Sequence, residues 1–200
     1  MVSQHGQPER LGLFGGTFDP PHVGHLIVAA HVREALGLDR ILFMPAMTPP
    51  HKQDREVSPG AVRLAMVERA IDGDERFSVS DMEVRRGGVS YTIDTVRGVL
   101  AGAPGTALTV LIGMDNLMDF GSWRDPAGIL AIARVAVMTR PGYVATGAGA
   151  DFLRQMTLCE VPHIGIAARD IRERVAAGKG IRYLVPAQVE AFIHEHGLYR

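Results

Sequence analysis

The sequence lacks several features that define whole classes of protein. Its 200 residues contain one cysteine, so no disulfide can form within the chain, as is usual in a reducing compartment. No apolar run approaches the length that crosses a membrane, and the first ten residues lack the apolar core of a secretion signal. The formal net charge is −1, which provides no overall attraction to nucleic acid or to an anionic membrane. These absences predict a cytoplasmic protein without nucleic-acid or membrane partners.

The residues that are present alternate between short apolar runs and longer amphipathic stretches. With 46% apolar and 22% charged residues, the composition is that of a globular protein, and the length suggests one domain. The expected strands are 10–16, 40–46, 77–84, 108–113 and 134–142. The expected helices are 23–38, 58–71 (capped by Ser58, with Pro59 first), 90–100, and two within 168–199, the second from Pro186. This alternation predicts an α/β fold, a Rossmann-like doubly wound parallel sheet with a small C-terminal helical subregion.

Polar clusters follow several of the expected strands. They lie at residues 15–25, 45–52 and 113–123 and at Arg140. In open parallel sheets, ligands bind beyond the carboxyl ends of the strands. The clusters are therefore expected to share one ligand-binding crevice.

The stretch GGTFDPPHVGH, residues 15–25, combines a glycine turn with two histidines. Gly15 and Gly16 allow a tight turn and the close approach of a ligand. In the helix that follows, His22 and His25 share one face of the first turn, beside free backbone N–H groups and the positive end of the helix dipole. Imidazoles can donate to phosphate oxygens and can become charged near neutral pH. The stretch is thus a phosphate site, an ordinary turn before a helix, or a zinc-binding pair, although no third ligand is apparent at motif spacing.

The same stretch strongly resembles the signature of the nucleotidyltransferase superfamily, whose H-x-G-H motif stands here at residues 22–25. The longer pattern is similar to that of the bacterial nicotinate mononucleotide adenylyltransferases. The resemblance continues, in order, through PPHK (49–52), SYTIDT (90–95), IGMDNLMDFGSW (112–123), RPG (140–142) and IRYLVP (181–186). It implies transfer of AMP from ATP to nicotinate mononucleotide, with release of pyrophosphate. It also implies a single domain, 1–200, whose C-terminal helical part, 166–200, closes the ATP site.

The resemblance further implies which residues bind ATP. His22 and His25 would contact the phosphates and stabilise the transition state, and Arg172 would clamp the β- and γ-phosphates. The other residues implied around ATP are Gly15, Gly16, Thr17, Phe18, Gly113, Asp115 and Arg169. Asp115 would meet the adenosine ribose, or else it caps the next helix. Mg²⁺ would accompany ATP and neutralise the pyrophosphate, and no residue is assigned to a metal.

For the mononucleotide, the resemblance makes Trp123 the partner that stacks on the pyridine ring, whereas a lone tryptophan is more commonly a core or rim aromatic. Backbone N–H groups near Thr92 and Arg124 would receive the nicotinate carboxylate, and Thr92 is equally a helix-start residue. Lys52 would reach the mononucleotide phosphate, although a lone surface lysine is the alternative, and Arg140 is a weaker candidate.

One motif departs from the family pattern. Where the family carries I-S-S-T-x-I-R, this chain has IAARDIR, residues 166–172, so Arg172 is kept while the hydroxyl residues are replaced by Ala167, Ala168 and Arg169. Backbone amides at the helix start, together with Arg169, are expected to take over the lost phosphate contacts. The alternative is weaker binding of ATP.

Three other functions stay open at this point. The acceptor could be nicotinamide mononucleotide or phosphopantetheine, with the same chemistry. The chain could also be a non-catalytic nucleotide sensor on the same fold, which only the altered 167–169 segment favours.

Overall fold

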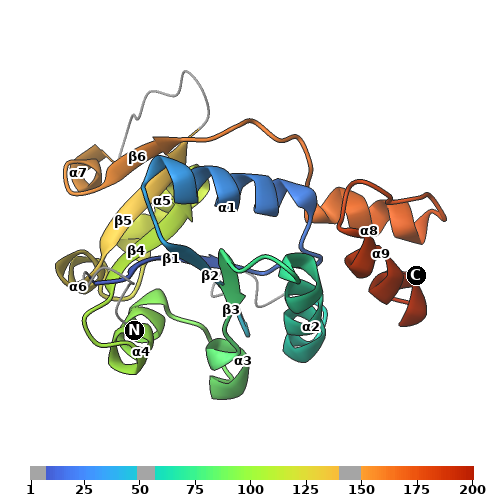
Figure 1. Ribbon diagram of the computed structural model, residues 1–200, viewed down its shortest axis with the longest axis horizontal. Coiled ribbons are helices and arrows are strands. Elements are labelled where there is room, and N and C mark those ends of the chain that lie inside the picture. Colours follow the sequence, from blue (N-terminus) through green and yellow to red (C-terminus); the bar gives the residue numbers. More distant parts are fainter. Residues whose placement is uncertain (1–7, 49–56, 140–149) are drawn as a thin grey trace.

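A parallel sheet forms the centre of the protein. The computed structural model describes residues 8–48, 57–139 and 150–200. Within these ranges, six strands pair in the order β3-β2-β1-β4-β5-β6, and every pairing is parallel (Figure 1). The strands are β1 (Arg10–Gly16), β2 (Arg40–Pro45), β3 (Phe77–Val79), β4 (Ala107–Gly113), β5 (Arg134–Thr139) and β6 (Thr157–Glu160). The predicted doubly wound parallel sheet is confirmed.

Helices cover both faces of the sheet. They are α1 (Val23–Ala35), α2 (Gly60–Ile71), α3 (Met82–Arg86), α4 (Thr92–Gly102), α5 (Met114–Asp119), the 3-10 turn η2 (Phe120–Ser122), α6 (Pro126–Ile132), α7 (Ala150–Leu153), α8 (Ala168–Ala176) and α9 (Ala187–Glu195). Side chains alternate along each strand between two apolar cores. Leu13 and Val110 pack under α4 and α6, whereas Phe43 and Leu111 pack under α1 and α2.

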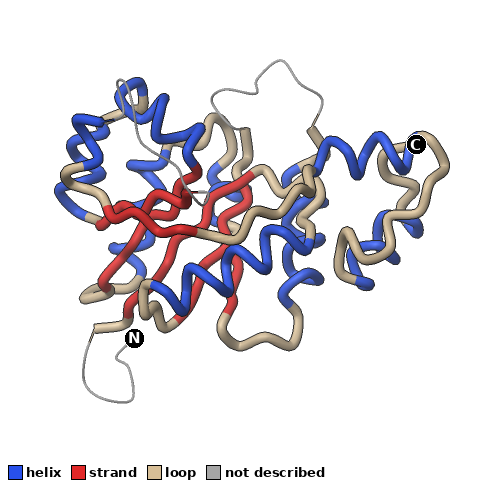
Figure 2. Tube along the Cα trace, turned by 90° about the horizontal axis from the view of Figure 1, so that it is seen from above, coloured by secondary structure: helices blue, strands red, loops and turns tan. Residues whose placement is uncertain are grey.

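The C-terminal helices have an apolar cluster of their own. Ile171 of α8 and Val189 of α9 are fully buried together with Met66 of α2. The helices extend from one end of the sheet rather than covering a face (Figure 2). The two helices expected at the C-terminus are therefore confirmed, and α2 joins them to the sheet.

Two details of the expected elements were wrong. The strand expected at 77–84 ends at Val79, because the hydroxyl of Ser80 accepts the N–H of Met82 and turns the chain into α3. Ser58 does not cap α2. Pro59 is the N-cap residue, while the N–H of Ser58 donates to Asp19 Oδ2 at 3.1 Å.

The topology places a crevice where β1 and β4 lie side by side. From β1 the chain proceeds outward to β2 and β3, returns to β4, and proceeds outward to β5 and β6 on the other side. The connections therefore diverge at the carboxyl ends of β1 and β4, the point where such sheets bind ligands. No helix in the described ranges is both long enough and apolar enough to cross a membrane.

Candidate active site

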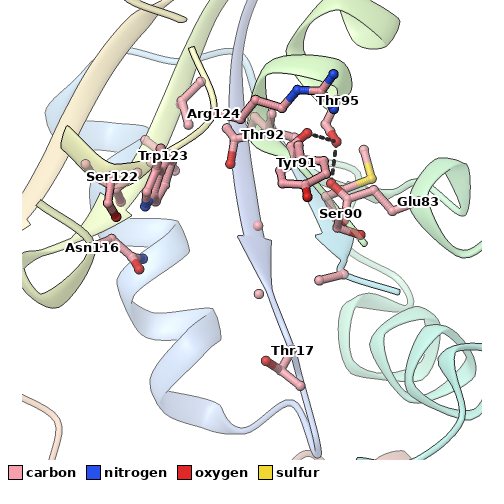
Figure 3. A pocket seen from close by; sticks show the side chains of 18 residues that line it. Thr17, Glu83, Ser90, Tyr91, Thr92, Thr95, Asn116, Ser122, Trp123 and Arg124 are labelled. Carbon is pink, nitrogen blue, oxygen red and sulfur yellow. Dashed lines mark hydrogen bonds between the residues drawn. The ribbon is translucent and has the colours of Figure 1, made fainter. Parts of the chain in front are cut away.

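A pocket of about 350 Å³ opens at the carboxyl ends of β1 and β4. Its floor is apolar and includes Leu13 and Ile112, and one side is formed by the loop that begins at Gly15. Figure 3 shows Trp123 and Asn116 to one side of the strands and Tyr91 and Thr95 to the other, with Thr17 on the loop below. The pocket therefore collects side chains from both halves of the sheet.

The Gly-rich loop, defined here as residues 15–22, connects β1 to α1. A Cβ atom on Gly16 would lie 2.8 Å from the ring of Phe18, which folds back onto the backbone and has a positive φ of 51°. Gly16 is therefore required for the turn itself. A Cβ on Gly15 would meet nothing within 4 Å, so Gly15 leaves open space on the pocket side. The loop therefore lines the pocket at its start and leads into the two histidines at its end.

The two histidines form a stacked pair at the start of α1. The rings of His22 and His25 are stacked, with centroids 3.7 Å apart, and Nδ1 of His25 accepts the backbone N–H of His22 at 3.1 Å. The neutral His25 ring therefore carries its proton on Nε2. A Cβ on Gly24 would approach His22 Nδ1 at 3.0 Å, which explains the glycine between the two histidines. Phe18 packs edge-on against His25 at 5.0 Å and holds the pair in place.

Only part of the helix start is free for a ligand. The N–H of Val23 donates to the carbonyl of Leu184, and that of His25 donates to the carbonyl of His22. Of the amides from His22 to His25, which all lie in the described residues, Gly24 is then the one for which the structure shows no acceptor on the chain. The expectation of several free amides was therefore wrong, because the C-terminal part occupies the first of them.

Both histidines are neutral at pH 7 in the free protein. Burial lowers the pKa of His22 to about 4. Burial, and to a lesser extent the neighbouring His22, lowers the pKa of His25 to about 3. Imidazoles that charge near neutral pH were expected, and desolvation by the surrounding aromatic side chains prevents this. In this state each ring can still donate one N–H.

This shift predicts a loss of stability in acid. The folded-state pKa values lie below the ordinary value of 6.5, so the unfolded chain binds more protons between that value and about pH 4. The stabilisation, on the order of 3 kcal/mol for His22 and about 5 kcal/mol for His25, is complete above about pH 6.5 and is lost as the pH falls toward 4 for His22 and toward 3 for His25. Melting temperatures measured across this range should fall steeply for the wild type. The slope should be shallower for His22→Asn/His25→Asn and unchanged for the exposed His194→Asn, and equal slopes in all three proteins would contradict the assignment.

A buried arginine binds the backbone of the Gly-rich loop. Arg63 of α2 is 1% exposed and donates to three backbone carbonyls, those of Thr17, Met47 and Ser58, at 2.8–2.9 Å. It therefore ties the loop to the segments before and after residues 49–56. Sequence reasoning missed this residue, although a signal existed: Arg63 lies in the apolar stripe of α2 with Gly60 and Val67, where an arginine needs a structural reason.

The two arginines expected to bind ATP differ in their surroundings. Arg172 of α8 is half-buried and donates from Nη1 to the carbonyl of Asp19 at 2.7 Å, which brings it to the Gly-rich loop. Arg169 is 76% exposed and lies 3.6 Å from Asp170 and 3.7 Å from Glu173. Ala167 caps α8 without a side-chain hydrogen bond. The structure thus joins Arg172 to the loop, while the phosphate role of Arg169 stays a prediction.

The residues expected to bind the mononucleotide gather in the pocket. Trp123, Arg124 and Thr92 all line it, and Thr92 is the first residue of α4. The guanidinium of Arg124 lies 4.9 Å from the ring centre of Tyr91 and 3.3 Å from the carboxylate of Asp94. The ring of Trp123 packs on Phe120 at 5.2 Å. The pocket is therefore apolar below, with an indole on one side and a helix N-terminus and a guanidinium on the other.

Four expected site residues remain. Two of them are described in the structure but do not line the pocket, and two lie outside the described residues. Gly113 caps α5, and Asp115 in the first turn is exposed and makes no side-chain cap hydrogen bond. The capping alternative for Asp115 is therefore not what the structure contains. Lys52 and Arg140 lie outside the described residues.

Several pocket residues were not singled out from the sequence. Glu83 is 6% exposed and accepts the hydroxyl of Thr95, which also receives Arg86 Nη2 at 3.0 Å. Asn116 and Ser122 line the opposite side. Thr95 lies in SYTIDT, and Asn116 and Ser122 lie in IGMDNLMDFGSW, so the motifs marked the segments but not the side chains that face inward. Across residues 8–48, 57–139 and 150–200, no group of three or more His, Cys, Asp or Glu could hold a metal ion.

Comparison with known proteins gives a consistent result. A family model described as cytidylyltransferase-like matches residues 13–174. A protein of Thermomicrobium roseum is 45% identical over 199 residues, which cover 96% of this chain and 92% of that protein. One of Salinibacter ruber is 42% identical over 190 residues, which cover 95% and 97%. Both are described as probable nicotinate-nucleotide adenylyltransferases.

Solved structures share the fold. The nicotinic acid mononucleotide adenylyltransferase of Plasmodium falciparum complexed with NaAD superposes with a TM-score of 0.77 over 96% of this chain and 97% of that one. Its sequence identity is 16%, so this likeness concerns the arrangement of strands and helices.

Proposed function

The chain belongs to the cytidylyltransferase-like family, and from this premise we propose that it transfers the AMP group of ATP to nicotinate mononucleotide, giving nicotinate adenine dinucleotide and pyrophosphate in NAD biosynthesis. The observation that carries the proposal is the position of the Gly-rich loop. The loop lines the pocket that contains Trp123 and leads directly into the stacked pair His22 and His25. Two nucleotides bound on the two sides would meet with their phosphates at Gly15.

The reaction needs positioning more than proton transfer. The phosphate of the mononucleotide is already an anion, and it attacks the α-phosphorus of ATP, whose bond to the β-phosphate oxygen breaks. No base is required, so catalysis rests on alignment and on stabilising negative charge. Neutral His25 offers Nε2–H to a phosphate oxygen, and His22 lies against it. Anionic oxygens nearby raise the pKa of both rings, which strengthens their hydrogen bonds as charge builds on the leaving group.

A residue of the C-terminal part completes the ATP-binding side of the site. Arg172, held by the carbonyl of Asp19, is placed to receive the β- and γ-phosphates with its remaining N–H groups. Mg²⁺ would enter as part of the substrate, because the ion prefers phosphate oxygens and water. When bound with ATP, it neutralises charge on the pyrophosphate.

The pocket supports a pyridine ring that carries a carboxylate. Trp123 offers an indole face to the cationic pyridinium. The N-terminus of α4 at Thr92 is positive, and Arg124 keeps N–H donors beyond the one that contacts Asp94, so both favour a carboxylate over a neutral amide. The acidic Glu83 in the same pocket is already bound by Thr95 and Arg86. This charge distribution supports nicotinate over nicotinamide as the acceptor.

A pyrophosphate-release assay tests the function. Purified protein with ATP and Mg²⁺ receives nicotinate mononucleotide, nicotinamide mononucleotide or phosphopantetheine in separate reactions. Release should be fastest with nicotinate mononucleotide. Fastest release with another acceptor would change the substrate assignment, and binding of ATP without any release would indicate a nucleotide sensor.

Trp123→Ala should raise the KM for nicotinate mononucleotide about 10-fold, which corresponds to a lost stacking interaction of about 1.4 kcal/mol. The KM for ATP should stay the same, because Trp123 lies on the pocket side of the loop. Trp123→Phe should recover part of the affinity. An equal rise in both KM values would instead indicate that Trp123 supports the fold through Phe120.

A further inference from the structure

Asp19, in the middle of the Gly-rich loop, is bound by residues from distant parts of the chain. It is 4% exposed. Its Oδ1 accepts the hydroxyl of Tyr199 at 2.5 Å, and its Oδ2 accepts the N–H of Ser58 at 3.1 Å. Its backbone carbonyl accepts Nη1 of Arg172 at 2.7 Å. One residue of the loop thus collects contacts from α8, from the segment before α2, and from the end of the chain.

Tyr199 follows α9 and is the penultimate residue of the chain. Its ring packs against the apolar cluster shared by α2, α8 and α9, and its hydroxyl lies 3.8 Å from Met66 Sδ. Burial, and then the hydrogen bond to Asp19, raises the pKa of Tyr199 well above its ordinary value, so the phenol stays protonated and donates at any physiological pH. The contact is therefore a hydrogen bond from a neutral donor to the carboxylate of Asp19.

The C-terminal part also holds the other end of the loop. The carbonyl of Leu184 accepts the N–H of Val23, the residue that follows His22. Tyr199 and Leu184 therefore anchor the loop on both sides of the cis Asp19–Pro20 bond and just before His25. Apolar packing fixes the ring of Tyr199, and its hydroxyl is one of several contacts that hold the loop.

We infer that Tyr199 is a positioning residue for the ATP side of the site. It acts through the Asp19 carboxylate and keeps the Gly-rich loop, the histidine pair and Arg172 in a fixed arrangement relative to one another. The inference rests on the proposed function for its kinetic part. Without the Tyr199 hydroxyl, a buried carboxylate oxygen loses its donor. Asp19 then gains freedom to rotate, and the carbonyl that orients Arg172 moves with it.

The inference makes a directional claim. Apart from Gly15, Gly16 and Thr17 of the Gly-rich loop, the walls of the pyridine pocket come mainly from α4 and from the segment around Trp123, and no described contact joins α4 or that segment to Tyr199. Loss of the hydroxyl should therefore weaken the binding of ATP much more than the binding of the mononucleotide. A general loss of folding would affect both substrates alike.

The test compares Tyr199→Phe with the wild type in the full chain. Equilibrium binding of ATP with Mg²⁺ is measured by calorimetry, and steady-state kinetics are measured for each substrate. We expect ATP to bind about 10-fold more weakly and kcat/KM for ATP to fall at least as much, which is the range for a hydrogen bond to a charged group. The KM for nicotinate mononucleotide should change less than about twofold, well below the effect on ATP. Wild-type binding of ATP by Tyr199→Phe would overturn the inference, as would equal losses for both substrates.

Two controls keep the result specific. Tyr183→Phe makes the same chemical change on a tyrosine that is 79% exposed in the same C-terminal part, and it should behave as wild type. Tyr199→Phe and Asp19→Asn should be strongly non-additive when combined, because each removes the same contact, and additive effects would contradict it. All proteins are compared at a temperature where circular dichroism shows them folded. If the wild type released no pyrophosphate, the proposed function would fail, and ATP binding would still decide the role of Tyr199.

Discussion

His25→Asn is expected to lower kcat by about 10²- to 10³-fold, the usual effect of removing one preorganised donor from a developing anion. Asparagine Oδ1 can take the place of imidazole Nδ1, which accepts the N–H of His22 at 3.1 Å. The variant therefore keeps the contact that starts α1, while it loses the Nε2–H donor and the ring contacts with His22 and Phe18. Its melting temperature at neutral pH should fall because these ring contacts are lost, so kcat is compared at a temperature where circular dichroism shows both proteins folded.

His25→Gln is the matched comparison. Its amide nitrogen reaches toward the position of Nε2, but its oxygen cannot also accept from His22. It should keep more activity than His25→Asn and lose more stability. If His25→Asn kept wild-type kcat while folded, the donor role of His25 would be wrong, and the pair would serve only to shape the helix start.

Arg172→Met is expected to reduce kcat/KM for ATP by about 10²-fold, roughly the 3 kcal/mol of a charge-assisted contact to phosphate. The KM for nicotinate mononucleotide should not change, because Arg172 contacts the Gly-rich loop at Asp19, and neither residue lines the pocket. Arg172→Lys should recover only part of the loss, since an ammonium cannot bond the Asp19 carbonyl and two phosphate oxygens in the same fork geometry.

Arg174→Met is the control for Arg172. Arg174 lies on the same helix, is exposed, and donates to the carbonyl of Gly180 rather than to the loop. The same loss of charge there should leave the kinetics for ATP unchanged. Equal losses in both variants would indicate that the positive charge of α8 matters and the clamp geometry does not.

The long elements of the fold could be predicted because their pattern is local. Continuous apolar runs such as 108–113 and the helical spacing in 23–38 each extend over enough residues to define a period. The short elements could not be predicted. β6 has four residues at the edge of the sheet, with one of them buried, and α5, α6 and α7 have four to seven residues. Segments of that length form because the tertiary structure holds them in place, not because of their own propensity.

The sequence by itself determined the Gly-rich loop, the pairing of His22 with His25, and the motif segments that line the pocket, since each depends on residues close together in the chain. Only the tertiary structure decided the charge state of the histidines, because desolvation comes from side chains packed around them. It alone also decided the anchoring roles of Arg63 and Tyr199. The Tyr199 contact joins residues 180 positions apart, and no local pattern encodes such a separation.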